Sequence, residues 1–127
     1  MTLPLPQKRK KVPMGVRIPE KRESQRHRRF IRGLECIAKV RDGANCVGAV
    51  EFCHVRSGLP EGEQAGIATK PHDCFGFPAC RWHHLTQHQH GEREFERVYG
   101  VKLLETALAL SLNSPDPEIR EKARSIR

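Results

Sequence analysis

The stretch from Cys80 to His90, CRWHHLTQHQH, concentrates side chains that bind metal ions. Four of the seven histidines of the chain fall within eight positions, directly behind a cysteine. A lone histidine is usually a satisfied core residue, but four so close together cannot all be buried in the neutral form. Because imidazole and thiolate are preferred ligands of zinc and related metals, this stretch predicts metal binding.

A structural zinc ion requires four nitrogen or sulfur ligands, which close pairs in two chain segments can supply. Cys80 and His83 form one pair at C-x2-H spacing, and two earlier cysteines with nine residues between them form the other, across the turn sequence RDGAN. Cys53 and Cys74 remain as spares, and either could replace a member of the set or be a buried free cysteine. We therefore expect a structural zinc ion bound by Cys36, Cys46, Cys80 and His83.

A second ion is predicted on the same helix. Adjacent helical residues point about 100° apart, so His84 cannot face the ion that His83 binds, whereas His84 and His88 lie on one face at i, i+4. We expect this pair to bind a second divalent ion. His54 strengthens the prediction, because it ends an expected strand, AVEFCHV, that is closed by Ser57-Gly58.

The elements that would position these side chains are short. Residues 34–58 mix β-branched residues with turn sequences, which predicts two short strands, and residues 59–78 lack any periodicity, which predicts a long loop. A helix is expected from Trp82 to about Gln89, continued by EREFERVY up to a C-cap at Gly100. The apolar stripe over residues 102–112 predicts a further helix, and the polar segment behind it is at best a short helix.

Positive charge is concentrated at the start of the chain. The sequence holds 23 Lys and Arg against 15 Asp and Glu, for a net charge of +8. Four prolines oppose a helix over the first twenty residues, so we expect residues 1–32 to be a largely flexible basic arm that becomes helical at about residues 20–31. Such an arm suits a nucleic-acid backbone, and the alternative is a solvated tail. The expected nucleic-acid contacts are Lys8, Arg9, Lys10, Lys11, Arg26, Arg28 and Arg29.

Composition limits the remaining possibilities. With 127 residues, 37% of them hydrophobic and 6% aromatic, the chain suits a single domain with a small core that a metal ion would help to stabilise. No apolar run reaches the roughly 18–20 residues of a membrane span, and the N-terminus lacks the apolar segment of a signal peptide. We expect a soluble, cytoplasmic protein, in which five cysteines indicate metal ligation rather than disulfides.

The spaced elements C…C…EFCHVRSG…KPHD…PAC-x2-HH-x3-H resemble HNH endonucleases of the ββα-metal fold, and the phage Ref-type and small prophage nucleases most closely. The resemblance covers residues 34–100. It implies an α+β fold with a zinc-stapled β-hairpin and helix, further C-terminal helices and the basic N-terminal arm. By the same resemblance His54 would be the general base, and His84 and His88 would hold the catalytic ion, Mg2+, Mn2+ or another divalent cation.

Two positions depart from the family pattern. Many members have a metal-binding aspartate where this chain has Cys53, a poor ligand for Mg2+, which would favour a softer ion or coordination by His84 and His88 alone. Asp73 could contribute a ligand or fix the long loop. The middle asparagine of the motif has no counterpart.

The predicted function is a metal-dependent HNH endonuclease that hydrolyses DNA, of phage or prophage origin, with a recombination or phage replication protein as a possible partner. The chemistry agrees, because phosphodiester hydrolysis needs a base for the attacking water and a cation for the developing charge. We expect an arm (1–32), a nuclease domain (33–113) and a polar C-terminal tail (114–127). One alternative is a non-catalytic, zinc-stapled nucleic-acid-binding module. Another, a zinc-built protein–protein adaptor, leaves the basic arm without a role.

Overall fold

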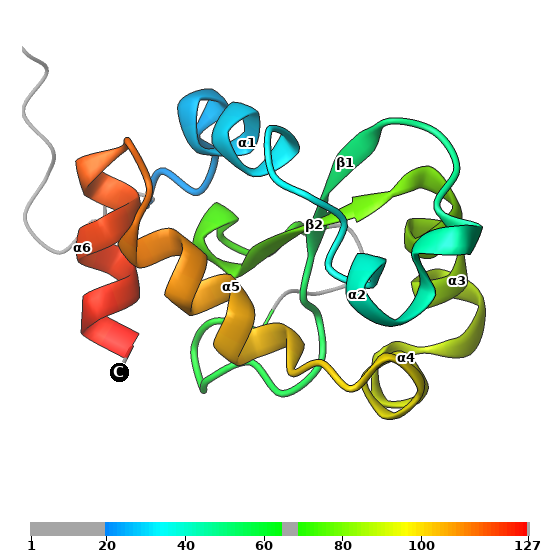
Figure 1. Ribbon diagram of the computed structural model, residues 1–127. Helices are drawn as coiled ribbons and strands as arrows, with labels where there is room; N and C mark the ends of the chain where they lie inside the picture. Colours follow the sequence, from blue (N-terminus) through cyan, green and yellow to red (C-terminus); the bar gives the residue numbers. More distant parts are fainter. Residues whose placement is uncertain (1–19, 65–68, 127) are drawn as a thin grey trace, which may run out of the picture.

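A two-stranded antiparallel sheet lies at the centre of the protein, surrounded by helices (Figure 1). The computed structural model describes residues 20–64 and 69–126. This mixed α/β architecture contains strands β1 (Val50–His54) and β2 (Gly76–Cys80). The α-helices in this part of the chain are α1 (Gln25–Arg32), α2 (Lys39–Asp42), α3 (Arg81–His90), α4 (Glu92–Tyr99), α5 (Leu103–Leu112) and α6 (Pro117–Ile126), with 3-10 turns at Gly43–Asn45 and Asp73–Phe75.

The hairpin pairs Val50 with Cys80 at one end and His54 with Gly76 at the other. The glycine is required there, because a Cβ on Gly76 would lie 2.0 Å from Cε2 of Phe52. β1 was predicted, but its partner was not: the sequence patterns indicated both strands within residues 34–58 and a loop over 59–78. That prediction is wrong because every residue of β2 is buried, so the strand lacks an alternating polar face.

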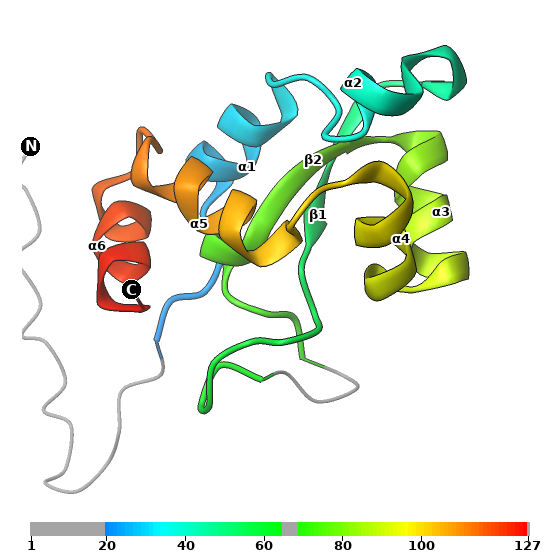
Figure 2. The same ribbon diagram turned by 60° about the horizontal axis from the view of Figure 1, so that its bottom comes forward.

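The helix α1 belongs to the packed body. Ser24 caps it by accepting a hydrogen bond from the backbone N–H of His27, and His27 and Ile31 are fully buried. α1 contacts both strands, and α5 packs against β2 from the other side of the hairpin (Figures 1 and 2). Residues 25–32 are therefore not part of a flexible arm. This differs from the sequence prediction, which extended the arm to residue 32. Residues 1–19 lie outside the described residues.

The C-terminal half also packs more completely than expected. The helices predicted behind Cys80 and over residues 102–112 are confirmed as α3 and α5, and Gly100 caps α4 in the left-handed conformation, with φ of 65°. The segment predicted as a polar tail forms α6, which packs on α5 and buries Ile119 and Ala123. None of the helices in residues 20–64 and 69–126 is long and apolar enough to cross a membrane.

Candidate metal centre and catalytic site

The four predicted zinc ligands lie together. The Sγ atoms of Cys36, Cys46 and Cys80 and a ring nitrogen of His83 all lie within 4.8 Å of one another. Nδ1 of His83 lies 3.4, 3.6 and 3.1 Å from these three sulfur atoms, respectively. Ligand atoms about 2.1–2.3 Å from a shared tetrahedral zinc ion have separations of this size. The cluster could therefore hold a metal ion such as zinc.

Short helices bring the cluster together. Cys36 precedes α2, and Cys46 follows the turn Gly43–Asn45, so the chain between them folds back on itself as the sequence RDGAN predicted. Cys80 is the N-cap of α3 and accepts a hydrogen bond from the backbone N–H of His83 at 3.5 Å. The wide spacing of the first pair is therefore closed by helical turns.

A carboxylate supports the histidine ligand from outside the cluster. Oδ2 of Asp42 lies 2.9 Å from Nε2 of His83, and Asn45 donates to the other oxygen at 2.7 Å. Because an ionised carboxylate only accepts hydrogen bonds, Nε2 carries the proton and Nδ1 presents its lone pair to the sulfurs. Sequence reasoning missed Asp42, since the DGAN segment indicated only a turn.

The thiols differ in acidity. Burial opposes ionisation of Cys80, but backbone N–H groups of His83 and Val47 donate to its sulfur and lower its pKa to about 7. Burial raises the pKa of Cys46 to about 12, and the neighbouring Cys36 adds to this effect. Three thiols this close resist ionising together, and a bound divalent cation would offset their repulsion.

The two spare cysteines lie outside the cluster. Cys53 and Cys74 are buried free thiols, and all five cysteines of the chain are unpaired. Burial raises the pKa of both, to about 12 for Cys74. Cys53 and Cys74 are therefore buried free cysteines and do not replace a member of the predicted ligand set.

The second predicted pair, His84 and His88, also lies together. Their Nε2 atoms are 3.1 Å apart, and Nδ1 of His84 lies 3.0 Å from Oε1 of Glu51 on β1. Sequence reasoning missed Glu51, which faces α3 from 33 residues away along the chain. In the described part of the chain, only the Cys3His cluster gathers three or more potential ligand atoms so closely.

His54 forms a third histidine–carboxylate contact, at the end of β1. Its Nε2 lies 2.9 Å from Oδ1 of Asp73, whose side chain is fully buried. Burial opposes ionisation of Asp73, but hydrogen bonds from His54, Arg28 and the backbone N–H of Ser24 outweigh it and lower its pKa to about 2. The carboxylate is therefore ionised, so Nε2 of His54 donates to it, and Nδ1 is the ring nitrogen left to accept a proton. Asp73 was expected either to bind the metal ion or to fix the long loop. Both of its oxygens already accept hydrogen bonds from protein groups, which favours the role of fixing the loop.

Arg28 is part of this network. Nε and Nη2 of Arg28 donate to the two oxygens of Asp73 at 2.7 and 2.9 Å. The guanidinium carbon lies 5.2 Å from the centre of the Phe52 ring, and that ring meets His54 edge-on. The other expected DNA contacts on α1, Arg26 and Arg29, are exposed. Lys8, Arg9, Lys10 and Lys11 lie outside the described residues.

Side chains of α3 and α4 hold the end of β1. Nε2 of Gln87 donates to the backbone carbonyl of His54 at 3.4 Å. The carboxylate of Glu92 accepts from the backbone N–H groups of Arg56 and Ser57 at 2.8 and 3.1 Å. The helix that carries His84 and His88 is thereby connected to the strand that carries His54.

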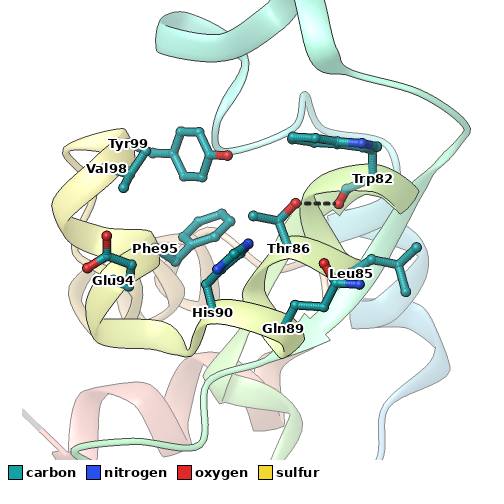
Figure 3. A pocket seen from close by; sticks show the side chains of 9 residues that line it. All are labelled: Trp82, Leu85, Thr86, Gln89, His90, Glu94, Phe95, Val98 and Tyr99. Carbon is teal, nitrogen blue, oxygen red and sulfur yellow. Dashed lines mark hydrogen bonds between the residues drawn. The ribbon is translucent and has the colours of Figure 1, made fainter.

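His90 lies apart from these clusters. It lines a hollow of about 350 Å³ between α3 and α4, with apolar walls that include Trp82, Leu85, Phe95 and Tyr99 (Figure 3). Helical periodicity places these α3 residues on a different face from His84 and His88. Of the four clustered histidines, only the first three therefore belong to the candidate metal sites.

Comparison of the chain with protein-family models, curated proteins and solved structures finds no significant match in any of the three. The hairpin and the Cys3His cluster are compatible with a ββα-metal fold, and the HNH resemblance rests on the sequence motifs.

Proposed function

We propose that this protein is a metal-dependent endonuclease of the HNH type that hydrolyses phosphodiester bonds in DNA. One observation supports this most strongly: the His54–Asp73 pair at the end of β1 lies three residues along the strand from Glu51, which contacts the His84–His88 pair. Residues three apart on a strand face opposite sides of the sheet, and Glu51 accordingly contacts α3, whereas His54 contacts the Asp73 carboxylate that Arg28 of α1 also binds. One short strand thus carries an oriented imidazole that could act as a base and a carboxylate that holds a histidine pair able to bind a metal ion.

His54 is the general base in this proposal. Nδ1 accepts the proton of the attacking water while Nε2–H donates to Asp73. The buried carboxylate orients the ring and stabilises the imidazolium that forms. Gln87 holds the backbone of the same residue, which limits movement of the base relative to α3.

His84 and His88 are the proposed ligands of the catalytic ion. Two nitrogens about 2.1 Å from one ion lie about 3 Å apart, which matches the 3.1 Å between their Nε2 atoms. Glu51 holds the other ring nitrogen of His84, so the lone pair of Nε2 is available. A bound divalent cation would neutralise charge on the phosphate and the leaving oxygen. Imidazole ligands favour Mn2+ or Zn2+ over Mg2+.

The net positive charge of the chain supports nucleic acid as the substrate. Lys and Arg side chains that contact phosphates raise the affinity of a protein for nucleic acid. The zinc ion would staple the small hairpin and helix. The motif resemblance further implies that the protein comes from a phage or prophage and that its partner is a recombination or replication protein.

Plasmid cleavage tests the proposal. Zinc-loaded protein should nick or linearise plasmid with Mn2+ or Mg2+ and lose activity in EDTA, and His54→Ala should lower the rate about 10²–10⁴-fold with the fold and zinc content unchanged. A His90→Ala variant is the matched control and should cleave normally. If wild-type protein binds DNA but cleaves none with any divalent ion, the non-catalytic binding module is the better description.

A further inference from the structure

We propose that Arg28 binds the oxyanion of the phosphodiester beside His54, which makes it a catalytic residue rather than a distant contact to the DNA backbone. This inference rests on the proposed function, since it defines how the same site would recognise its substrate. Its basis is the position of the guanidinium relative to Asp73 and His54.

One carboxylate oxygen places the two groups side by side. Nη2 of Arg28 and Nε2 of His54 each lie 2.9 Å from Oδ1 of Asp73, so these nitrogens are no more than about 6 Å apart. A phosphate oxygen that contacts the guanidinium would therefore bring its phosphorus close to the histidine ring.

The guanidinium has donors left for a ligand. Its hydrogen bonds to Asp73 use Nε and Nη2, and Glu23 is 3.8 Å from Nη2. Within residues 20–64 and 69–126, Nη1 has no hydrogen-bond partner, and it carries two N–H groups. The Arg28 side chain is 16% exposed and the Asp73 side chain is fully buried, so an anion can approach the guanidinium but not the carboxylate.

The arginine is also held in place. The bidentate contact with Asp73 restrains one edge of the guanidinium, and Phe52 lies 5.2 Å from its carbon atom. Donors held in advance stabilise a transition state more than mobile ones, because no reorganisation is needed. Arg32 is the contrast on the same helix, since it is exposed.

Charge development favours the same assignment. Arg28 and Asp73 cancel each other while His54 is neutral. When Nδ1 of His54 accepts the proton from water, the three side chains together carry one positive charge. Their attraction for the phosphate is then greatest as negative charge accumulates on its oxygens, which is when it lowers the barrier.

The first experiment compares two substrates. Single-site oligonucleotides with either a phosphodiester or a neutral methylphosphonate at the scissile position are cleaved by wild type, Arg28→Lys and the control Arg32→Lys. Lysine keeps the charge opposite Asp73 but lacks the Nη1 donors. We expect Arg28→Lys to lower phosphodiester cleavage about 10²–10³-fold and methylphosphonate cleavage much less. Arg32→Lys should stay within about twofold on both.

The second experiment needs neither cleavage nor a variant. Inorganic phosphate is titrated into zinc-loaded wild-type protein at constant ionic strength, with chloride as the reference, while the NMR signals of the Arg28 side chain and the His54 ring are followed. We expect phosphate-specific shifts at both. If these shifts appear but wild type cleaves no DNA, the nuclease proposal fails and the anion site stands. Equal reductions on the two substrates, or no phosphate-specific shift, would overturn the role of Arg28.

Discussion

Nε2 of His54 lies 2.9 Å from Oδ1 of Asp73, although 19 positions separate the two residues in the chain. The same kind of histidine–carboxylate contact recurs at His83 and at His84. Each carboxylate fixes which ring nitrogen carries the proton, and so which one presents a lone pair. The three contacts are His54–Asp73, His83–Asp42 and His84–Glu51, at 2.9, 2.9 and 3.0 Å.

Loss of a zinc ligand should unfold the protein. Purified wild type is expected to hold about one zinc ion per chain, and Cys80→Ser should lose it and most of its thermal stability, because binding energy at a structural zinc site is folding energy. Cys74→Ser is the control, because this thiol is buried outside the cluster. Elemental analysis and thermal melting measure both effects. A folded Cys80→Ser protein with no zinc would contradict the staple.

Substitution of the second histidine pair should separate the two metal sites. We expect His84→Ala and His88→Ala to keep the structural zinc and to abolish both Mn2+ binding, measured by calorimetry on zinc-loaded protein, and cleavage. Glu51→Gln should weaken Mn2+ binding about 10–100-fold, since the carboxylate that orients His84 is removed. Loss of the structural zinc from His84→Ala would show that the adjacent histidines have exchanged roles.

Asp73→Asn should impair the base without removing it. The amide matches the carboxylate in size but carries no charge to stabilise a protonated His54. We expect a fall in cleavage rate of about 10²–10⁴-fold with zinc content retained, together with some loss of thermal stability because Arg28 no longer has an ion pair. Asp116→Asn, a substitution at a carboxylate that accepts from Ser24, provides the control. Wild-type rates for Asp73→Asn would remove the aspartate from the mechanism.

The buried His27 should make folding sensitive to mild acid. Burial lowers its pKa to about 4, whereas the unfolded chain takes up the proton near pH 6.5. The free energy of unfolding should therefore fall as pH drops from about 6.5 to about 4, by on the order of 2 kcal/mol between pH 8 and pH 5.

His27→Gln tests this expectation, since glutamine does not titrate. Its stability, measured by denaturant unfolding at both pH values, should fall less than that of wild type on acidification. The exposed His90 provides the control, and His90→Gln should follow wild type. Equal pH dependence of wild type and His27→Gln would exclude the buried histidine as the cause.

Deletion of residues 1–19 tests the basic arm and leaves α1 in place. If Lys8, Arg9, Lys10 and Lys11 bind phosphates, the slope of log K against log salt should become shallower by about 0.9 for each phosphate that the shortened protein no longer neutralises. Deleting only residues 1–7, which carry no Lys or Arg, should leave the slope unchanged. Fluorescence anisotropy with a labelled duplex measures both. An unchanged slope after the longer deletion would make the segment a solvated tail.

The second strand shows where sequence patterns stop being informative. Gly76–Cys80 is buried at every position and contains Pro78, so neither alternation nor β propensity marks it as a strand. It becomes one because Phe52 packs over Gly76 and the backbone pairs with β1. Likewise, nothing local distinguishes Arg28 from its neighbours on α1, yet only the tertiary fold aligns it with a buried aspartate.

Residue types and short spacings were enough to predict the Cys3His cluster that could hold a metal ion, and the helix that contributes two of its members. Cys80, His83, His84 and His88 occupy one helix or its cap, so helical geometry alone places His84 and His88 on a different face from the Cys3His cluster. The carboxylates that orient the three histidines lie 19, 33 and 41 positions away along the chain. Such contacts leave no periodic pattern in the sequence, because they form only when the hairpin, α3 and the turn after α2 pack together, and the tertiary structure alone determined them.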